Sequence, residues 1–211
     1  MSGHTRGKLE LSRLYAIVDA GCFPDAPSLY RFTEELLAGG VRLLQYRNKS
    51  GNARLMLEQA RELKRIAGDQ PALIMNDRAD LCVLAGYDGV HLGQDDLSAE
   101  GARKVIGPDL WLGVSTHNPD QVAQADETSA TYIAIGPVFT TSSKEKPDPV
   151  VGLDGVRHAR SLTNKPLTAI GGITRDNCRD VIAAGADSVA VISDLLLEPR
   201  QSAEEFLRLL R

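Results

Sequence analysis

The chain has 211 residues, the length expected of one domain, and 43% of them are hydrophobic, which is enough for a buried core. Its 24 basic and 28 acidic residues leave a net charge of −4, which argues against nucleic acid or an anionic membrane as the main partner. Charges interrupt every apolar stretch before it could span a membrane, and the polar N-terminus lacks the apolar segment of a signal peptide. Three scattered cysteines, without a CxxC pair, are typical of a reduced, cytoplasmic protein. We expect residues 1–12 to form a flexible tail and residues 13–211 one domain.

Short apolar runs alternate with amphipathic helical patterns along this domain. The runs predicted to be strands are 14–18, 41–44, 73–75, 89–92, 110–114, 132–135, 167–170 and 188–192. The helical patterns that follow them are 29–37, 55–66, 79–85, 98–106 (with Ser98 as its cap), 119–125 (with Asn118 as its cap), 153–162, 174–185 (with Thr174 as its cap) and 202–210. Strands that are apolar throughout are typical of parallel sheets buried on both faces.

This alternation predicts the fold class. Eight strand–helix units indicate closure into a single (β/α)8 TIM barrel. The alternative is an open, doubly wound sheet, which would place a G-x-G-x-x-G turn after the first strand, and residues 19–22 do not supply one. In a barrel, active sites lie at the C-terminal ends of the strands, so polar residues at those ends are candidates for function.

Two aspartates follow neighbouring predicted strands. Asp77 comes directly after the run 73–75, and Asp96 follows the run 89–92. Parallel strands joined by a crossover helix end on the same edge, so we expect both carboxylates on one rim, with Asn76 beside them. Such a pair suits Mg²⁺, which binds oxygen ligands and takes phosphate oxygens as well. The alternative is that each aspartate caps the helix that follows it. The occurrence of the pair in adjacent units favours the metal.

A basic segment follows the second predicted strand. Gln45, Arg47 and Lys49 alternate along the chain, so they share one face if the strand continues through them. One amide and two cations directed into the mouth of a barrel suit a phosphate or a pyrophosphate. The alternative is a solvated basic loop.

Two other regions indicate ligand binding. The longest predicted loop, 136–152, carries Lys144 after a run of hydroxyl residues, and loops of this kind often close over ligands. The alternative is a disordered polar loop. Gly171-Gly172 and Ile192-Ser193 follow the seventh and eighth strands, where barrels commonly bind phosphate with backbone amides. A glycine pair can equally serve only to make a turn.

The remaining candidates are histidines. His117 lies at the predicted rim and is a candidate acid or base, whereas His91 lies within a strand and is expected to be a packed or hydrogen-bonded barrel residue. No Ser–His–Asp or Cys–His arrangement follows from the spacing. We therefore expect chemistry that depends on positioning and electrostatics around phosphate rather than on covalent catalysis.

A series of short motifs between Leu14 and Ser193 resembles thiamine phosphate synthases. In chain order they are Gln45-x-Arg47-x-Lys49, Asn76-Asp77-Arg78, HLGQDD from His91 to Asp96, GVSTH from Gly113 to His117, GPVF from Gly136 to Phe139, Ser143-Lys144, and AIGGI from Ala169 to Ile173. The resemblance implies a cytoplasmic TIM-barrel transferase that joins hydroxymethylpyrimidine pyrophosphate to a thiazole phosphate, releases pyrophosphate and uses Mg²⁺. It implies small-molecule partners, with no nucleic acid and no membrane, and allows a homo-oligomer.

The resemblance also implies roles for individual residues. The metal ligands are Asp77 and Asp96. The residues expected at the pyrimidine pyrophosphate are Gln45, Tyr46, Arg47, Asn48, Lys49, Asn76, Ser115 and Lys144, of which Arg47, Lys49, Ser115 and Lys144 are expected to be catalytic. The residues expected at the thiazole phosphate are Thr141, Ser142, Ser143, Gly172, Ile192 and Ser193.

Two other functions are compatible with the same barrel. A paralogous thiazole tautomerase would need a proton shuttle, for which His117 is the candidate, but no metal pair and no cations for pyrophosphate. A non-catalytic barrel that binds thiamine phosphates would bind without turnover. The presence of both aspartates and of the basic segment favours the synthase.

Overall fold

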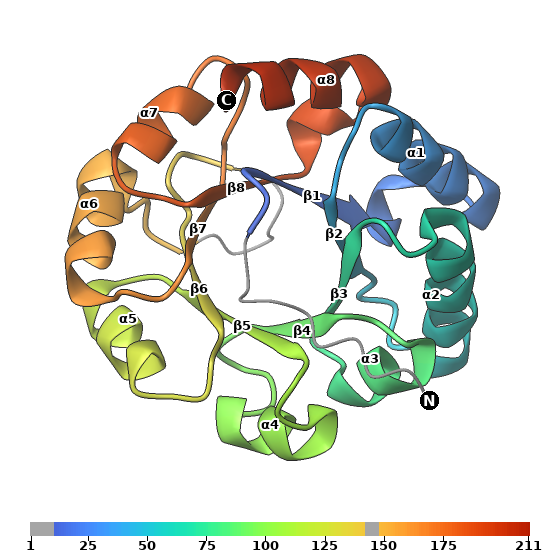
Figure 1. Ribbon diagram of the computed structural model, residues 1–211, viewed down its shortest axis with the longest axis horizontal. Coiled ribbons are helices and arrows are strands. Elements are labelled where there is room, and N and C mark those ends of the chain that lie inside the picture. Colours follow the sequence, from blue (N-terminus) through green and yellow to red (C-terminus); the bar gives the residue numbers. More distant parts are fainter. Residues whose placement is uncertain (1–10, 142–147) are drawn as a thin grey trace.

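The structure is a computed structural model that describes residues 11–141 and 148–211. Within these residues, parallel strands close into a barrel in the order β1 to β8, surrounded by helices (Figure 1). The strands are β1 (Leu14–Asp19), β2 (Leu43–Arg47), β3 (Ala72–Asn76), β4 (Gly89–Leu92), β5 (Trp111–Thr116), β6 (Tyr132–Ile135), β7 (Leu167–Ile170) and β8 (Ser188–Val191). The predicted TIM barrel is confirmed. Residues 1–10 of the predicted tail lie outside the described residues, and the domain boundaries stay a prediction.

The helices lie on the outside of the barrel. They are α1 (Ala26–Ala38), α2 (Ala53–Ala67), α3 (Ala79–Ala85), α4 (Ala99–Ile106), α5 (Pro119–Asp126), α6 (Gly152–Leu162), α7 (Cys178–Ala183) and α8 (Pro199–Leu209). Two short 3₁₀ helices, η1 (Ala20–Cys22) and η2 (Ser193–Leu195), follow β1 and β8. None of the helices in the described ranges has the length and apolarity that crossing a membrane requires.

Among the differences between the predicted and the observed bounds of the elements, two have a clear physical reason. The second strand was predicted at 41–44 but spans Leu43–Arg47, because its polar end pairs in register with both neighbouring strands. The seventh helix was predicted to begin at Thr174 but begins at Cys178. The cap prediction was wrong because a turn comes first, in which the Asn177 side chain accepts a hydrogen bond from the Thr174 amide at 2.9 Å.

Side chains of the strands divide the core into two layers. Outward residues such as Leu14, Ala16 and Val18 pack with apolar residues of the helices into one large cluster. The inward residues Tyr15, Ile17, Leu43, Ile74, Tyr132 and Ala190 form a separate cluster inside the barrel. This two-residue alternation is what places the polar residues near the strand ends inside the mouth.

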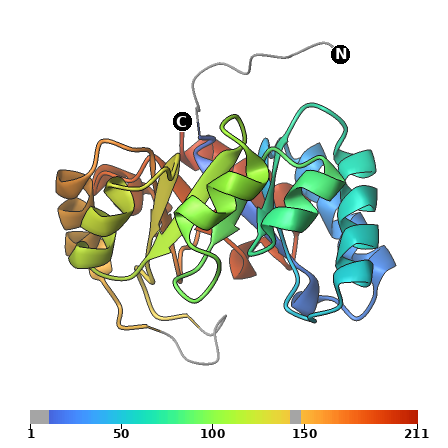
Figure 2. The same ribbon diagram turned by 90° about the horizontal axis from the view of Figure 1, so that it is seen from below.

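The loops that follow the strands gather at one end of the barrel. In the side view of Figure 2, the segment after β6 (yellow to orange) lies at the lower end, opposite the C-terminus of the chain. Asn118 and Ser98, predicted helix caps at this end, accept hydrogen bonds from the Gln121 and Gly101 amides at 2.9 and 3.1 Å. Both cap predictions are confirmed.

Candidate active site

A cavity opens at the end of the barrel where the strands finish. Its lining includes eight of the predicted site residues: Gln45, Arg47, Asn76, Ser115, Thr141, Gly172, Ile192 and Ser193. The structure also brings in residues that the sequence did not single out for binding, among them Tyr15, His91, His117 and Thr168. These side chains share the inward rows of the strands or begin the loops that follow them.

A chain of hydrogen bonds crosses the floor of this cavity; we call it the floor chain. The Gln45 amide donates to the Tyr15 hydroxyl at 2.8 Å. The Tyr15 and Tyr132 hydroxyl oxygens are 3.1 Å apart, and Tyr132 Oη lies 2.9 Å from His91 Nδ1. His91 Nε2 lies 2.9 Å from Ser115 Oγ. Burial raises the pKa of both tyrosines, so both are neutral phenols at physiological pH.

The two predicted metal ligands occupy the rim beside the cavity. Asp77 accepts a hydrogen bond from the Lys49 ammonium at 2.5 Å, and Asp96 accepts one from the Gly93 amide at 2.7 Å. Burial raises the pKa of Asp77, and the neighbouring Asp96 carboxylate raises it further against the opposing effect of Lys49. The two carboxylates are therefore close enough to repel each other, and a divalent cation would relieve that repulsion.

Neither aspartate acts as a helix cap. The residue at the cap of α3 is Arg78, which makes no side-chain cap bond, and Ser98 caps α4. Asp77 instead has a φ of 62° and is the one described residue other than glycine with positive φ. Such backbone strain is concentrated at functional sites. The capping alternative is thus contradicted by the structure.

The side chains of the basic segment point in two opposite directions. Arg47 forms an ion pair with Asp19 at the mouth, and its position in the cavity agrees with the expected face. Tyr46 and Asn48 point the other way, toward α2, where both hydrogen-bond Gln59 Oε1, at 2.6 and 2.9 Å. Their side chains are therefore not among the groups that face the cavity, because Tyr46 on β2 and Asn48 just after it alternate with Gln45 and Arg47 along the chain.

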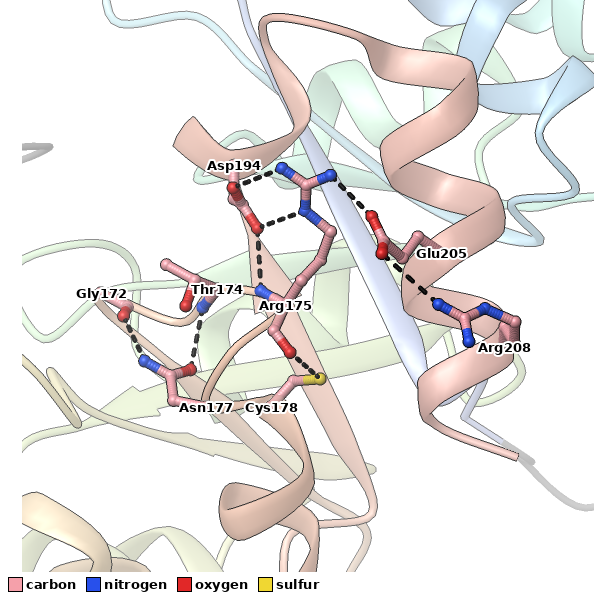
Figure 3. Close-up of polar contacts among 8 residues, drawn as sticks. All are labelled: Gly172, Thr174, Arg175, Asn177, Cys178, Asp194, Glu205 and Arg208. Carbon is pink, nitrogen blue, oxygen red and sulfur yellow. Dashed lines mark hydrogen bonds and ion pairs between the residues drawn. The ribbon is translucent and has the colours of Figure 1, made fainter.

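The loops after β7 and β8 are tied together by hydrogen bonds and ion pairs (Figure 3). The Arg175 amide donates to Asp194 at 2.8 Å, and its guanidinium bonds the same carboxylate at 3.1 Å and Glu205 of α8 at 2.8 Å. Asn177 donates to the Gly172 carbonyl at 3.1 Å, so the glycine pair is held from the same side. These bonds fix the backbone of the two loops relative to each other.

His117 is also held in place. Its Nδ1 lies 2.5 Å from the Gly136 carbonyl oxygen, and its Nε2 lies 3.5 Å from the Asp148 carboxylate. Thr141, further along the same loop, also lines the cavity. The predicted residues Ser142, Ser143 and Lys144 lie outside the described residues.

Two polar atoms in the lining are buried without a hydrogen-bond partner among the described residues, Asn76 Nδ2 and Thr168 Oγ1. Buried polar groups are normally paired, so each is a candidate contact for a ligand. No group of three or more His, Cys, Asp and Glu side chains in residues 11–141 and 148–211 is arranged to hold a metal ion. The acidic pair would need ligands from a substrate, as Mg²⁺ commonly has.

Comparison with known proteins assigns the family. The sequence model of a family described as thiamine monophosphate synthase matches residues 14–195. The chain belongs to the thiamine monophosphate synthase family. A thiamine-phosphate synthase of Koribacter versatilis is 63% identical over 96% of this chain and 97% of its own length. Another, from Caldicellulosiruptor bescii, is 38% identical over 90% of this chain and 88% of its own length.

A solved structure gives the same result. The thiamine phosphate pyrophosphorylase of Pyrococcus furiosus superposes with a TM-score of 0.81 at 32% identity, covering 94% of this chain and 95% of that one. As a member of the thiamine monophosphate synthase family over nearly its whole length, the chain is a transferase of thiamine biosynthesis with thiamine-phosphate synthase activity. This activity, rather than the tautomerase or binding-only alternatives, is the one that these relatives' names carry.

Proposed function

We propose that the chain condenses hydroxymethylpyrimidine pyrophosphate with a thiazole phosphate, releasing pyrophosphate, with Mg²⁺ bound by Asp77 and Asp96. The observation that carries this proposal is that groups suited to phosphate lie on two sides of one cavity. Arg47 lines one side, with Lys49 and the acidic pair on the rim beside it, and the glycine pair of the loop after β7 and Ser193 line the other. A transfer between two phosphorylated substrates requires two such sides.

The acidic pair fits the metal by its chemistry. Two neighbouring carboxylates, of which Asp96 raises the pKa of Asp77, lie next to a cavity rather than at helix caps and supply the oxygen ligands that Mg²⁺ prefers. When bound, Mg²⁺ neutralises charge on the pyrophosphate and so assists its departure. Gln94, which follows β4, donates to the Ser115 carbonyl at 2.5 Å and holds the loop that carries Asp96 against β5.

The side proposed for the pyrophosphate contains cationic donors that form ion pairs with carboxylates. Arg47 is paired with Asp19 and Lys49 with Asp77, so both cations are held at the mouth of the barrel by carboxylates. The unpaired amide nitrogen of Asn76 adds a neutral donor. These groups, with Lys144 from outside the described residues, would stabilise the charge that develops on the departing oxygen.

The thiazole phosphate is assigned to the opposite side. Gly172 has a φ of 63°, and its backbone lies open to the cavity beside Ile192 and Ser193. Barrels of this class commonly bind phosphate through the loops after the seventh and eighth strands. With its phosphate held there and Thr141 beside it, the thiazole nitrogen is positioned to attack the pyrimidine carbon.

We propose that pyrophosphate departs before the attack, leaving a pyrimidine cation. The lining that is described contains no thiol and no lysine amine, and the three free cysteines lie elsewhere. The thiazole nitrogen is then the nucleophile. We expect an electron-poor pyrimidine analogue to react far more slowly than the natural substrate in single-turnover measurements, because its cation is less stable. Equal rates would rule out this order of events.

The bonds behind the two loops give a separate prediction. Replacing Asp194 by asparagine removes the charge that holds the amide and the guanidinium of Arg175. We expect KM for the thiazole phosphate to rise by about tenfold with little change in kcat, since a charge-assisted hydrogen bond contributes about 1.5–3 kcal/mol. Steady-state kinetics with each substrate varied in turn measures this. Glu204→Gln is the matched control, because Glu204 pairs with Arg200 on the exposed surface of α8. A fall in kcat alone would contradict the assignment.

The proposed function is tested by supplying both substrates with and without Mg²⁺ and measuring pyrophosphate and thiamine phosphate together. Equal amounts of both products, dependent on Mg²⁺, are expected. Conversion of the thiazole alone, or binding without release of pyrophosphate, would reject the proposal in favour of one of the alternatives. We further propose a cytoplasmic enzyme, in keeping with its three free cysteines, while a homo-oligomer stays a prediction.

A further inference from the structure

We propose that the floor chain fixes which atoms donate and which accept at its two ends, Gln45 and Ser115, and thereby selects a ring that carries an amino group. Tyr15, Tyr132 and His91 are positioning residues in this view, since they act through the two residues at the ends. The inference rests on the proposed function in one respect: the ring bound at the cavity floor is the pyrimidine.

The floor chain is continuous, and the two tyrosines at its centre are buried. Its members come from five different strands, β2, β1, β6, β4 and β5, and its links measure 2.8, 3.1, 2.9 and 2.9 Å. Tyr15 and Tyr132 are 1% and 0% exposed, so water does not compete for their hydroxyl groups. In such a setting each proton is committed to one neighbour, because an unpaired buried donor is costly.

The first link sets the direction of all the others. Gln45 presents its amide nitrogen to Tyr15, so the Tyr15 oxygen accepts and its own proton goes to Tyr132. The Tyr132 proton then goes to Nδ1 of His91. An imidazole that accepts at Nδ1 carries its proton on Nε2 when neutral, and His91 therefore donates to Ser115 Oγ.

This direction leaves one acceptor and one donor for a ligand. The Gln45 carbonyl oxygen is not used by the link to Tyr15 and accepts. The Ser115 hydroxyl already receives a hydrogen bond and donates its own proton. A ring between them must offer a donor to Gln45 and an acceptor to Ser115, which an aminopyrimidine does through its amino group and a ring nitrogen. The corresponding oxopyrimidine offers a carbonyl in place of the amino group, and accommodating it would require every proton in the chain to reverse.

Gly113 indicates that this geometry occupies all the available space. A Cβ atom at this position would lie 2.1 Å from Cζ of Tyr132, 2.3 Å from its hydroxyl oxygen and 2.4 Å from Nδ1 of His91. Gly113 is not among the glycines with positive φ, so backbone conformation does not account for it. The missing side chain is what allows Tyr132 and His91 to meet.

The test compares two pyrimidine pyrophosphates, one carrying the amino group and one carrying an oxo group in its place. We expect wild-type kcat/KM to favour the amino compound by about 10⁴-fold, as in sites built to hydrogen-bond one partner. Tyr132→Phe should lower this ratio by about tenfold or more while KM for the thiazole phosphate stays unchanged. An unchanged ratio would overturn the proposal.

Tyr87→Phe is the matched control, because Tyr87 is also a buried tyrosine and donates to the Ala60 carbonyl at 3.1 Å, outside the cavity lining. It should lose stability without a change in the ratio. An equal change in both variants would mean that Tyr132 is merely structural, and this too would overturn the proposal. Should Tyr132→Phe fail to fold, Tyr15→Phe breaks the chain one link earlier and carries the same expectation.

A second measurement does not depend on turnover. Nitrogen-15 NMR of the histidine rings, with the signal of His91 assigned by its loss in His91→Asn, reports which ring nitrogen holds the proton. We expect protonation at Nε2 in the wild type and a mixture of tautomers in Tyr132→Phe. Protonation at Nδ1 in the wild type would overturn the proposal. If no pyrophosphate were released by the wild type, the proposed function would fail while the tautomer result remained interpretable.

Discussion

Replacing Asp96 by asparagine is expected to lower kcat for pyrophosphate release by about 10²–10³-fold, and Asp77→Asn should have the same effect. Each replacement removes one of the charged residues proposed to bind Mg²⁺, and with it part of the electrostatic stabilisation of the departing pyrophosphate. The variants should also need more Mg²⁺ for half-maximal activity. Rates of pyrophosphate release over a Mg²⁺ titration measure both effects. Asp95→Asn is the matched control, because Asp95 is the exposed neighbour of Asp96 and belongs to no proposed site. Full activity of either variant at low Mg²⁺ would show that the metal binds elsewhere.

The same replacement at Asp77 has a consequence for stability. Because burial and Asp96 raise the pKa of Asp77, its charged form is less favourable in the folded metal-free protein than in the unfolded chain. Asparagine removes that charge and tolerates positive φ, so the melting temperature of metal-free Asp77→Asn should not fall below that of the wild type at pH 7. Any gain should disappear as the pH falls below about 4, where this aspartate becomes protonated in the unfolded chain as well as in the folded protein. A lower melting temperature at pH 7 would mean that the ion pair with Lys49 outweighs the burial.

Gly172→Ala is expected to raise KM for the thiazole phosphate by about tenfold or more, with a smaller effect on kcat, because the loop that presents the backbone must move. A Cβ at this position would lie 2.5 Å from the Thr140 carbonyl oxygen and 2.8 Å from Cβ of Phe139. Kinetics with the thiazole phosphate varied at saturating pyrimidine substrate measure the change.

Gly68→Ala separates this crowding from backbone strain. Gly68 has the same φ of 63° as Gly172, but nothing lies within 4 Å of a Cβ built on it. Both variants lose the freedom of glycine to adopt a positive φ, which costs about 1 kcal/mol of stability or somewhat more. Gly68→Ala should therefore lower the melting temperature and leave both KM values unchanged. An unchanged KM in Gly172→Ala as well would place the thiazole phosphate elsewhere in the cavity.

Most of the barrel followed from local patterns in the sequence. The runs at 89–92, 132–135 and 167–170 have the predicted bounds because apolar strands end sharply at glycine or a polar residue. The end of β2 was missed, since Gln45, Tyr46 and Arg47 are polar or amphipathic and are kept in the strand by pairing with distant segments. Strand pairing of this kind depends on the closed barrel and cannot be recognised from the local pattern of apolar residues.

The candidate site was predictable to a similar extent. Residues after the strand ends, such as Asp77 and Asp96, were placed on one rim by the topology of parallel strands alone. Tyr15 and Tyr132 were not foreseen, because a tyrosine in a strand usually signals packing and these two are 117 residues apart in the chain. The side chain of Tyr46 faces α2 rather than the cavity. The resemblance covers a continuous stretch of sequence and so does not distinguish residues that face opposite sides of a strand.

The inward-facing residues of the strands and the loops that follow the strands differ in the sequence changes that they tolerate. Shifting β2 or β5 by one residue would turn Gln45 or Ser115 out of the cavity and bring its neighbour in. The inward-facing residues of the strands, which form the wall of the cavity, therefore tolerate substitution but not a change in strand register. Loops after β7 and β8 can change in length at little thermodynamic cost. Directed evolution toward a different nucleophile should therefore succeed with changes in these loops, whereas a different ring would demand several coordinated replacements on the wall. Under the proposed function, the pyrimidine is recognised by strands whose register is fixed by the barrel, and the thiazole phosphate by loops that tolerate changes in length.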